Sequence, residues 1–377
     1  MNTIDVKGNH FDKIGKGIIA HNASSSPITI NENNEFYNVD YGIVIRETIG
    51  IVLIDGNNFN GLGYSPLVPV NYGISAITIQ NFNDYATTNT ISVSGNIITD
   101  SRIGIHALNI PNLSIGANLN TPVAGTGNTI SFSKEKGQYH HGIWVENCNS
   151  AKIQSNTINS TEPGFYLEGI TVYESTDALI NMNTITDATV PVNVRGSCPD
   201  TEFHCNVFDN DAEPGLGVQL VAADLPPQGG NTDPWNNEWY GYDNSTLFGV
   251  TGLANSPFDW YYKTGPSKYN PYPASGTANP FGTSAPGSAC VVQAATNDPD
   301  RDVRYAAIAE DSLAFTEYEN EFIYKSKKYL FEQIYADTSL LTKNTAKDTT
   351  FSRFYSDLYV TNIGLFRHVD SLIMAKI

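Results

Sequence analysis

The chain has 377 residues, of which only 16% are charged, and its formal net charge is −18. This acidic excess excludes nucleic acid as a partner, because the chain offers no cationic surface that would neutralise a series of phosphates. It argues in the same way against anionic membrane surfaces. No run of 18 apolar residues is present, so we expect no membrane insertion. The 31 glycines and the recurring asparagines are typical of a turn-rich β protein.

The first 225 residues contain a repeat in which an asparagine is followed two residues later by Phe or Ile. The eight pairs are Asn9/Phe11, Asn34/Phe36, Asn57/Phe59, Asn96/Ile98, Asn128/Ile130, Asn156/Ile158, Asn183/Ile185 and Asn206/Phe208. A second element, usually Gly-Ile-x-Ile/Val, follows each pair and begins at Gly17, Gly42, Gly73, Gly104, Gly142, Gly169, Pro191 and Gly217. Self-similarity with a minimal period of about 22 residues indicates a solenoid. The repeat therefore predicts a coil of about eight rungs over residues 1–225.

Each asparagine of the repeat has a structural explanation. Asparagine tolerates left-handed backbone angles at a sharp bend, and stacked asparagine amides can hydrogen-bond to one another along the axis of a coil. The Phe or Ile that follows points into the core, because side chains alternate along a strand. We therefore expect the eight asparagines to be scaffold residues and assign none of them to catalysis.

The period is lost after residue 225. Residues 226–300 are rich in Pro, Gly and aromatic residues and are expected to form an irregular segment that covers the last rung, with an aromatic ligand platform as the alternative. Residues 301–377 are expected to form a helical tail, with one helix over 302–335 and a second over 345–376. Tyr355, Leu358, Asn362, Leu365, Val369 and Leu372 follow a 4-3 spacing in the second helix. This spacing predicts that the two helices pair as a hairpin.

The repeat resembles the parallel β-helix repeat of the pectate-lyase-like superfamily, and the resemblance covers residues 1–225. It implies an all-β right-handed parallel β-helix. That superfamily includes lyases, glycoside hydrolases, epimerases, phage tailspikes and surface proteins without activity, so the fold alone does not fix the function. The tail is similar to the Lys/Tyr-rich helical stretch that follows the repeats in large surface proteins of Bacteroidetes-type bacteria. This second likeness implies a bacterial protein that is secreted or displayed at the cell surface.

A candidate ligand-binding patch lies on the strands that begin with the Gly-Ile element. If Ile143 and Val145 point inward, Trp144 and Glu146 must point outward. Stacking of the rungs places further outward side chains beside them, so that the patch consists of Trp144, Glu146, Tyr173, Asn193 and Arg195. Aromatic rings with charged and amide neighbours suit sugar rings, which need a flat apolar surface rimmed by hydrogen-bonding groups. The sequence therefore favours a polysaccharide or a cell-surface glycan as the ligand.

His141 and Glu168 are the candidate catalytic residues. They precede the glycines of neighbouring rungs and should lie side by side, and a histidine beside a carboxylate can shuttle protons. Inserted segments at 131–141 and 159–168 flank them. His141-Gly142 resembles the histidine motif of polygalacturonase-like glycoside hydrolases, but the acid and the base of that family have no counterpart in the chain. Whether the protein is an enzyme is therefore left open.

Three functions follow as alternatives: a secreted or cell-surface module for binding or display, a polysaccharide-degrading glycoside hydrolase or lyase, and a structural spacer. No resident cofactor is expected, although Asp209, Asp211 and Glu213 have a spacing that could hold calcium. The four cysteines lack a CxxC pair, which argues against zinc, and their spacing leaves disulfide pairing open. Because residues 1–11 read as the middle of a repeat, we expect further rungs or domains of a longer chain as partners.

Overall fold

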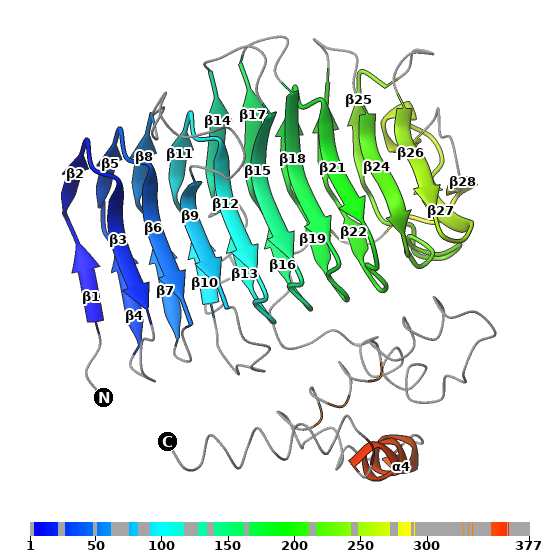
Figure 1. The fold of residues 1–377 in the computed structure, drawn as a ribbon. Coiled ribbons are helices and arrows are strands. Elements are labelled where there is room, and N and C mark those ends of the chain that lie inside the picture. The colour runs from blue at the N-terminus through cyan, green and yellow to red at the C-terminus, as the bar shows by residue number, and fades with distance from the viewer. Residues whose placement is uncertain are drawn as a thin grey trace. The chain divides into compact units, whose positions relative to one another are not determined.

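The computed structural model divides the chain into two units, residues 1–295 and residues 296–377, which are described separately. It describes residues 4–21, 27–47, 51–61, 75–81, 91–116, 127–133, 139–161, 166–210, 216–242, 248–271, 278–287 and 290, together with 327, 331, 334, 348–359 and 361. The first unit is a right-handed parallel β-helix in which strands of successive rungs lie side by side (Figure 1). The predicted fold class is therefore confirmed.

Three parallel sheets form the walls of the coil, and each of the first eight rungs contributes one strand to each sheet. Sheet A contains β1 (Ile4–Lys7), β4 (Ile28–Asn31), β7 (Val52–Asp55), β10 (Ile91–Ser94), β13 (Ser114–Gly116), β16 (Lys152–Gln154), β19 (Leu179–Asn181) and β22 (Glu202–His204). Sheet B contains β2 (His10–Asp12), β5 (Glu35–Tyr37), β8 (Asn58–Asn60), β11 (Ile97–Thr99), β14 (Thr129–Phe132), β17 (Thr157–Ser160), β20 (Thr184–Thr186), β23 (Val207–Asp209) and β25 (Glu238–Tyr240). Sheet C contains β3 (Lys16–His21), β6 (Tyr41–Arg46), β9 (Ser75–Gln80), β12 (Ile103–Leu108), β15 (Tyr139–Glu146), β18 (Tyr166–Tyr173), β21 (Val190–Arg195), β24 (Leu216–Ala223) and β26 (Phe248–Ala254).

The interior is filled by stacked apolar side chains that occupy the same register position in successive rungs. Phe11, Phe36 and Phe59 stack with ring centroids 4.9 and 4.6 Å apart. The position is then taken by isoleucines in the middle rungs and by Phe208 and Trp239 in the last two. Each fully buried side chain of this size stabilises the fold by about 1.5–3 kcal/mol. The sequence rule that the residue two positions after the asparagine points inward is therefore correct.

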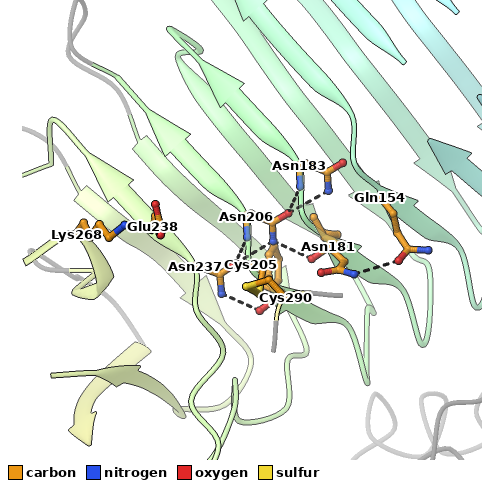
Figure 2. Close-up of a disulfide and its surroundings, with 11 residues drawn as sticks. Gln154, Asn181, Asn183, Cys205, Asn206, Asn237, Glu238, Lys268 and Cys290 are labelled. Carbon is orange, nitrogen blue, oxygen red and sulfur yellow. Dashed lines mark hydrogen bonds and ion pairs between the residues drawn. A yellow bond between two sulfur atoms is a disulfide. The ribbon is translucent and has the colours of Figure 1, made fainter. Parts of the chain in front are cut away.

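The repeat asparagines form one continuous hydrogen-bonded ladder from Asn9 to Asn237. The side-chain nitrogen of each donates to the side-chain oxygen of the next, at 2.8–3.0 Å. The same nitrogen also donates to a backbone carbonyl of sheet A, as Asn206 does to Ile180. Figure 2 shows the part of the ladder that contains Asn183, Asn206 and Asn237. The predicted scaffold role is confirmed, and Asn237 is a ninth member that the repeat analysis missed.

The third rung differs from the prediction in the position of its sheet C strand. Gly73, the predicted start, lies outside the described residues, and Ala76 takes the place of the glycine, with its carbonyl oxygen close to Gly42. Ile43 pairs with Ile77, so Ile77 points inward, whereas a strand element that began at Gly73 would turn Ile77 outward. The long insertion between Phe59 and this strand lets the alignment slip by three residues.

The coil continues past residue 225, where the sequence placed its end. β25 and β26 add a ninth strand to sheets B and C, and β27 (Phe258–Lys263) pairs with β28 (Ala278–Thr283) in a separate parallel sheet. Trp260 is fully buried, with its ring 5.6 Å from Phe203 and 5.7 Å from Trp239. Several aromatic residues of the segment 226–300 therefore fill the interior of the last coils.

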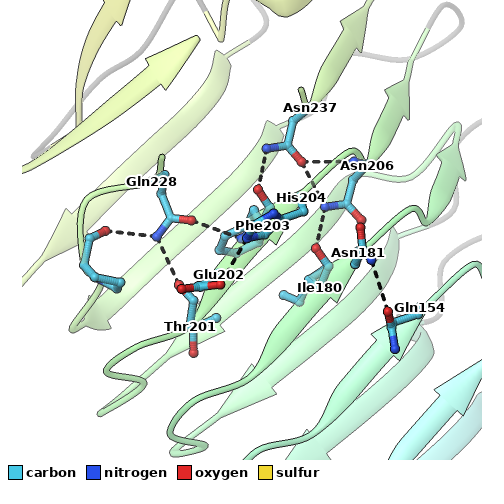
Figure 3. Close-up of polar contacts among 11 residues, drawn as sticks. Gln154, Ile180, Asn181, Thr201, Glu202, Phe203, His204, Asn206, Gln228 and Asn237 are labelled. Carbon is cyan, nitrogen blue, oxygen red and sulfur yellow. Dashed lines mark hydrogen bonds and ion pairs between the residues drawn. The ribbon is translucent and has the colours of Figure 1, made fainter. Parts of the chain in front are cut away.

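Gln228 completes the edge of sheet A with its side chain. Its amide oxygen accepts the backbone N–H of Phe203 at 3.1 Å, and its amide nitrogen donates to the carbonyl of Thr201 at 3.0 Å (Figure 3). A further parallel strand would satisfy the same two backbone groups. The backbone of Gln228 in turn pairs with β27 around Trp260. One glutamine therefore joins the last strand of sheet A to the strands that follow it.

A disulfide joins Cys205, in the turn between β22 and β23, to Cys290 (Figure 2). It closes a span of 85 residues that contains all the strands after the eighth rung. Cys148 and Cys198 are buried free thiols, and burial raises the pKa of each to about 12. These two thiols are therefore core side chains rather than nucleophiles.

The described part of the second unit is helical. α4 (Asp348–Tyr359) lies within the predicted second helix, and residues 327, 331 and 334 are helical within the predicted first helix. The ring of Phe331 stacks on that of Tyr355 at 4.9 Å, so the two segments contact each other through a residue of the predicted 4-3 spacing. The rest of the predicted hairpin lies outside the described residues.

The ladder makes a prediction for stability. In an Asn183→Ala variant, the backbone N–H and the side-chain nitrogen of Asn156 lose their shared acceptor, and the carbonyl of Ile153 loses its donor. Buried groups without a partner cost about 1–3 kcal/mol each, so the free energy of unfolding should fall by about 3 kcal/mol or more in urea denaturation. Asn159→Ala is the control, because Asn159 lies on β17 outside the ladder and is partly exposed. Equal losses in the two variants would contradict the ladder's role.

Candidate functional site

Sheet C is wider at β15 and β18 than at the neighbouring strands. Both strands have eight residues and begin two positions earlier than β12 and β21, which have six. The extra pairs are Tyr139 with Tyr166 and His140 with Leu167. Alternate residues face outward, except at Gly142–Ile143 and Gly169–Ile170, where two successive residues face inward. These two strands therefore present four outward pairs, which are Tyr139/Tyr166, His141/Glu168, Trp144/Thr171 and Glu146/Tyr173.

All seven residues singled out in the sequence lie on the outward side of this part of sheet C. His141 pairs in register with Glu168, as expected. Asn193 continues the row of Trp144, and Arg195 continues the row of Glu146 and Tyr173. The sequence treated the catalytic pair and the ligand-binding patch as separate groups. The structure joins them, because the Arg195 guanidinium extends back along the sheet to Glu168.

Glu168 is a buried carboxylate with three partners. Its side chain is 3% exposed, and its oxygens accept hydrogen bonds from Arg195 Nη2 at 2.6 Å and from Thr171 Oγ1 at 2.7 Å. Nδ1 of His141 lies 3.5 Å from Oε2. Burial alone would raise the pKa of Glu168, but the interactions with His141 and Thr171 and the charge of Arg195 outweigh it and lower the pKa to about 2. Glu168 is therefore ionised at neutral pH and cannot act as a general acid.

Trp144 lies between two histidine rings. Its ring centroid is 4.7 Å from that of His141 and 5.3 Å from that of His106, and both rings are tilted by about 40° against it. Burial and the neighbouring His141 lower the pKa of His106 to about 4, so His106 is neutral at physiological pH. The three rings form an aromatic cluster over β12 and β15, beside the Glu168 carboxylate.

Several polar atoms on this face have no hydrogen-bond partner among the described residues. They include both amide atoms of Asn193, which is 0% exposed, Nε1 of Trp144, Nε2 of His106 and Oγ1 of Thr78. Thr78, His106 and Trp144 occupy one register row, and Asn193 lies further along the same row. Buried polar groups are nearly always paired in folded proteins. The unpaired atoms therefore mark this row as a candidate for contact with a ligand.

The end of β18 brings an aromatic ring and two carboxylates together. Burial and the charge of Glu174 raise the pKa of Glu146, and the pKa of Tyr173 is raised chiefly by Glu174. Gly196 has a positive φ of 69°, and a β-carbon there would lie 2.9 Å from the side chain of Glu174 and 3.2 Å from the ring of Tyr173. A glycine at this position leaves room for both side chains.

Two residues of the site were missed by the sequence analysis. The rings of Tyr139 and Tyr166 meet edge to face at 4.5 Å, and Tyr139 is 60% exposed. Proximity to Glu168 contributes, after burial, to a raised pKa of Tyr166. A direct comparison of the segments YHHGIWVE and YLEGITVY would have found this pair, because each tyrosine precedes the catalytic candidate by two positions.

The described residues contain no group of three or more metal-ligating side chains. Asp211 and Glu213, two of the three residues with calcium-like spacing, lie outside the described part of the chain. No helix in the described residues is long and apolar enough to cross a membrane.

The buried charge and the neutral histidine predict how stability depends on pH. The pKa of Glu168 falls from 4.5 to about 2 on folding, so its contribution is complete above pH 4.5 and is lost as the pH falls toward 2. The pKa of His106 falls from 6.5 to about 4, so its contribution is lost as the pH falls from 6.5 toward 4. In urea denaturation, Glu168→Gln should cost about 3 kcal/mol at pH 7 and progressively less below pH 4.5.

His106→Gln should remove the part of the pH dependence between 6.5 and 4 and leave the lower part in place. Glu146→Gln is the matched control on the same face, because its pKa is raised in the folded state and its ionised form is therefore not stabilised. A loss of stability at pH 7 in Glu146→Gln as large as that in Glu168→Gln would contradict this assignment.

One comparison with known proteins supports the fold. A protein family described as "right handed beta helix region" matches residues 120–225, which carry β15, β18 and β21. No curated protein sequence matches the chain. The family match and the three parallel sheets together identify the chain as a right-handed parallel β-helix repeat protein.

Proposed function

We propose that the protein is a secreted or cell-surface β-helix module that binds an extended polysaccharide or a cell-surface glycan on sheet C. The observation that carries this proposal is the setting of Trp144, whose ring lies between two histidines and beside a row of unpartnered polar groups. An aromatic surface rimmed by hydrogen-bonding groups is the arrangement that sugar rings require. The rigid coil holds these groups at fixed spacing, which suits recognition of a regular polymer.

Two further observations support an extracytoplasmic setting. The Cys205–Cys290 bond is of a kind that persists in oxidising compartments. The resemblance of the repeat to the pectate-lyase-like superfamily and of the tail to Bacteroidetes-type surface proteins agrees with this setting. We therefore propose that the protein meets its ligand outside the cell that produces the protein.

Glycan binding is tested by isothermal titration or affinity electrophoresis against a panel of soluble polysaccharides. Trp144→Ala and Tyr173→Ala should each weaken binding about tenfold or more, because each removes a ring that stacks on a sugar. Tyr240→Ala is the control, since Tyr240 is an exposed aromatic residue on sheet B, far from the site in sequence and sheet. Wild-type affinity in both site variants would refute the patch. Absence of binding to every polymer would favour a structural spacer.

A second candidate function is polysaccharide degradation, and the contact between His141 and Glu168 favours it. The ionised Glu168 can orient the imidazole through Nδ1, which would leave Nε2 to take or give a proton. The test is incubation with a polysaccharide panel, with and without calcium, followed by a reducing-end assay and mass spectrometry. His141→Ala should abolish product formation, and Tyr240→Ala, on sheet B, should not. Full activity in His141→Ala would remove this site, and absence of product from the wild type would leave binding as the function.

A further inference from the structure

The aromatic side chains of sheet C are distributed along the strands rather than along the axis of the coil. On β15 and β18 they occur at the beginning, as Tyr139 and Tyr166, in the middle, as Trp144, and at the end, as Tyr173. Along the axis, the type of residue in each of these rows changes within a few rungs. The row of His141 and Glu168, for example, continues as Ile103 on one side and Val190 on the other.

The two ends of this aromatic lane are too far apart for one sugar. Glu146 lies seven positions after Tyr139, and at about 3.3 Å per residue the lane measures up to about 23 Å. Tyr139 and Tyr166 at one end and Tyr173 at the other can therefore contact separate units of one polymer. The His106–Trp144–His141 cluster lies between the two ends.

The charges along the lane disfavour an anionic polymer. Arg195 is already paired with Glu168, so it offers no uncompensated positive charge. Glu146 and Glu174 place two carboxylates at the Tyr173 end, and the charge of Glu174 adds to burial in raising the pKa of Glu146. The whole chain adds to this field with its net charge of −18. A polymer of uronates would meet repulsion along most of its length.

Resting on the glycan-binding function above, we propose that the ligand is a linear, uncharged polysaccharide that lies along β15 and β18, across the coil axis, with Tyr139 and Tyr166 as a second sugar-binding platform. Trp144 and His106, whose side chains are partly exposed, contact the polymer in the central part of the lane. The paired Glu168 and Arg195 hold the floor of the lane in place without contributing net charge.

The first arm of the test measures affinity as a function of ligand length. Size-fractionated oligosaccharides of the uncharged polymer bound best by the wild type are titrated against the wild type, Tyr139→Ala and Tyr139→Ala/Tyr166→Ala. Affinity should rise with length in the wild type, and the variants should lose about tenfold for long ligands while binding the shortest ones normally. Tyr41→Ala is the control, because Tyr41 lies in the register row of His141 three rungs away.

The second arm compares polygalacturonate with its fully methyl-esterified form, which has the same backbone without the charge. Tighter binding of the ester by about tenfold or more supports the proposal, and equal or tighter binding of the acid overturns it. Unchanged affinity for long ligands in both tyrosine variants would overturn the proposal that the polymer lies along β15 and β18. An equal loss of affinity for short and long ligands would overturn it as well. Neither result would contradict glycan binding itself. Failure of the wild type to bind any polymer would instead overturn the proposed function.

Discussion

The asparagine ladder is the constraint on which the rest of the structure depends. Each amide fixes the height and the rotation of its rung, because it contacts the next amide and a carbonyl of sheet A at the same time. Once the bend before sheet B is fixed, the position two residues later must point inward, and the sheet C strand of each rung falls into register with its neighbours. The ladder thereby determines which side chains share a row on the outer face, although it lies on the other side of the coil's core.

The site depends on that register in an unusual way for a repeat protein. Neighbouring rungs supply different chemical groups to one row, as His141 and Glu168 do, and Trp144 follows His141 by three residues on the same strand. Holding the Glu168 carboxylate away from water carries a desolvation penalty, which Arg195 and Thr171 offset through short hydrogen bonds. Strongly perturbed pKa values such as that of Glu168 cluster at functional sites.

The sequence predicts the coil well because its constraints are local and periodic. The Asn-x-Phe/Ile motif marks a bend and an inward-pointing side chain within three residues. Both features depend on local residues alone. An insertion changes the distance from the asparagine to the next strand. The predicted start of the third sheet C strand, which contains Ile77, is therefore three residues too early. The repeat analysis missed Asn237 because the residue two positions later is Trp239 rather than Phe or Ile. The ion pair between Arg195 and Glu168 could not be predicted from register, because it depends on the reach of a long side chain from one register row to another. The role of Gln228 could not be predicted either, because its side chain, rather than a strand, hydrogen-bonds to the backbone at the edge of sheet A.

Every amide in the ladder points the same way, with its nitrogen toward the rung that follows. The coil therefore has a direction, and a new rung can join it only in one orientation. The stretch from Asn183 to Asn206 is among the shortest of the repeats and contributes one strand to each sheet. A duplicate of this stretch would meet the same donors and acceptors on both sides that the original meets. The protein is therefore a modular scaffold whose length can be changed one coil at a time, which would move the aromatic lane relative to the capped end without altering the lane itself.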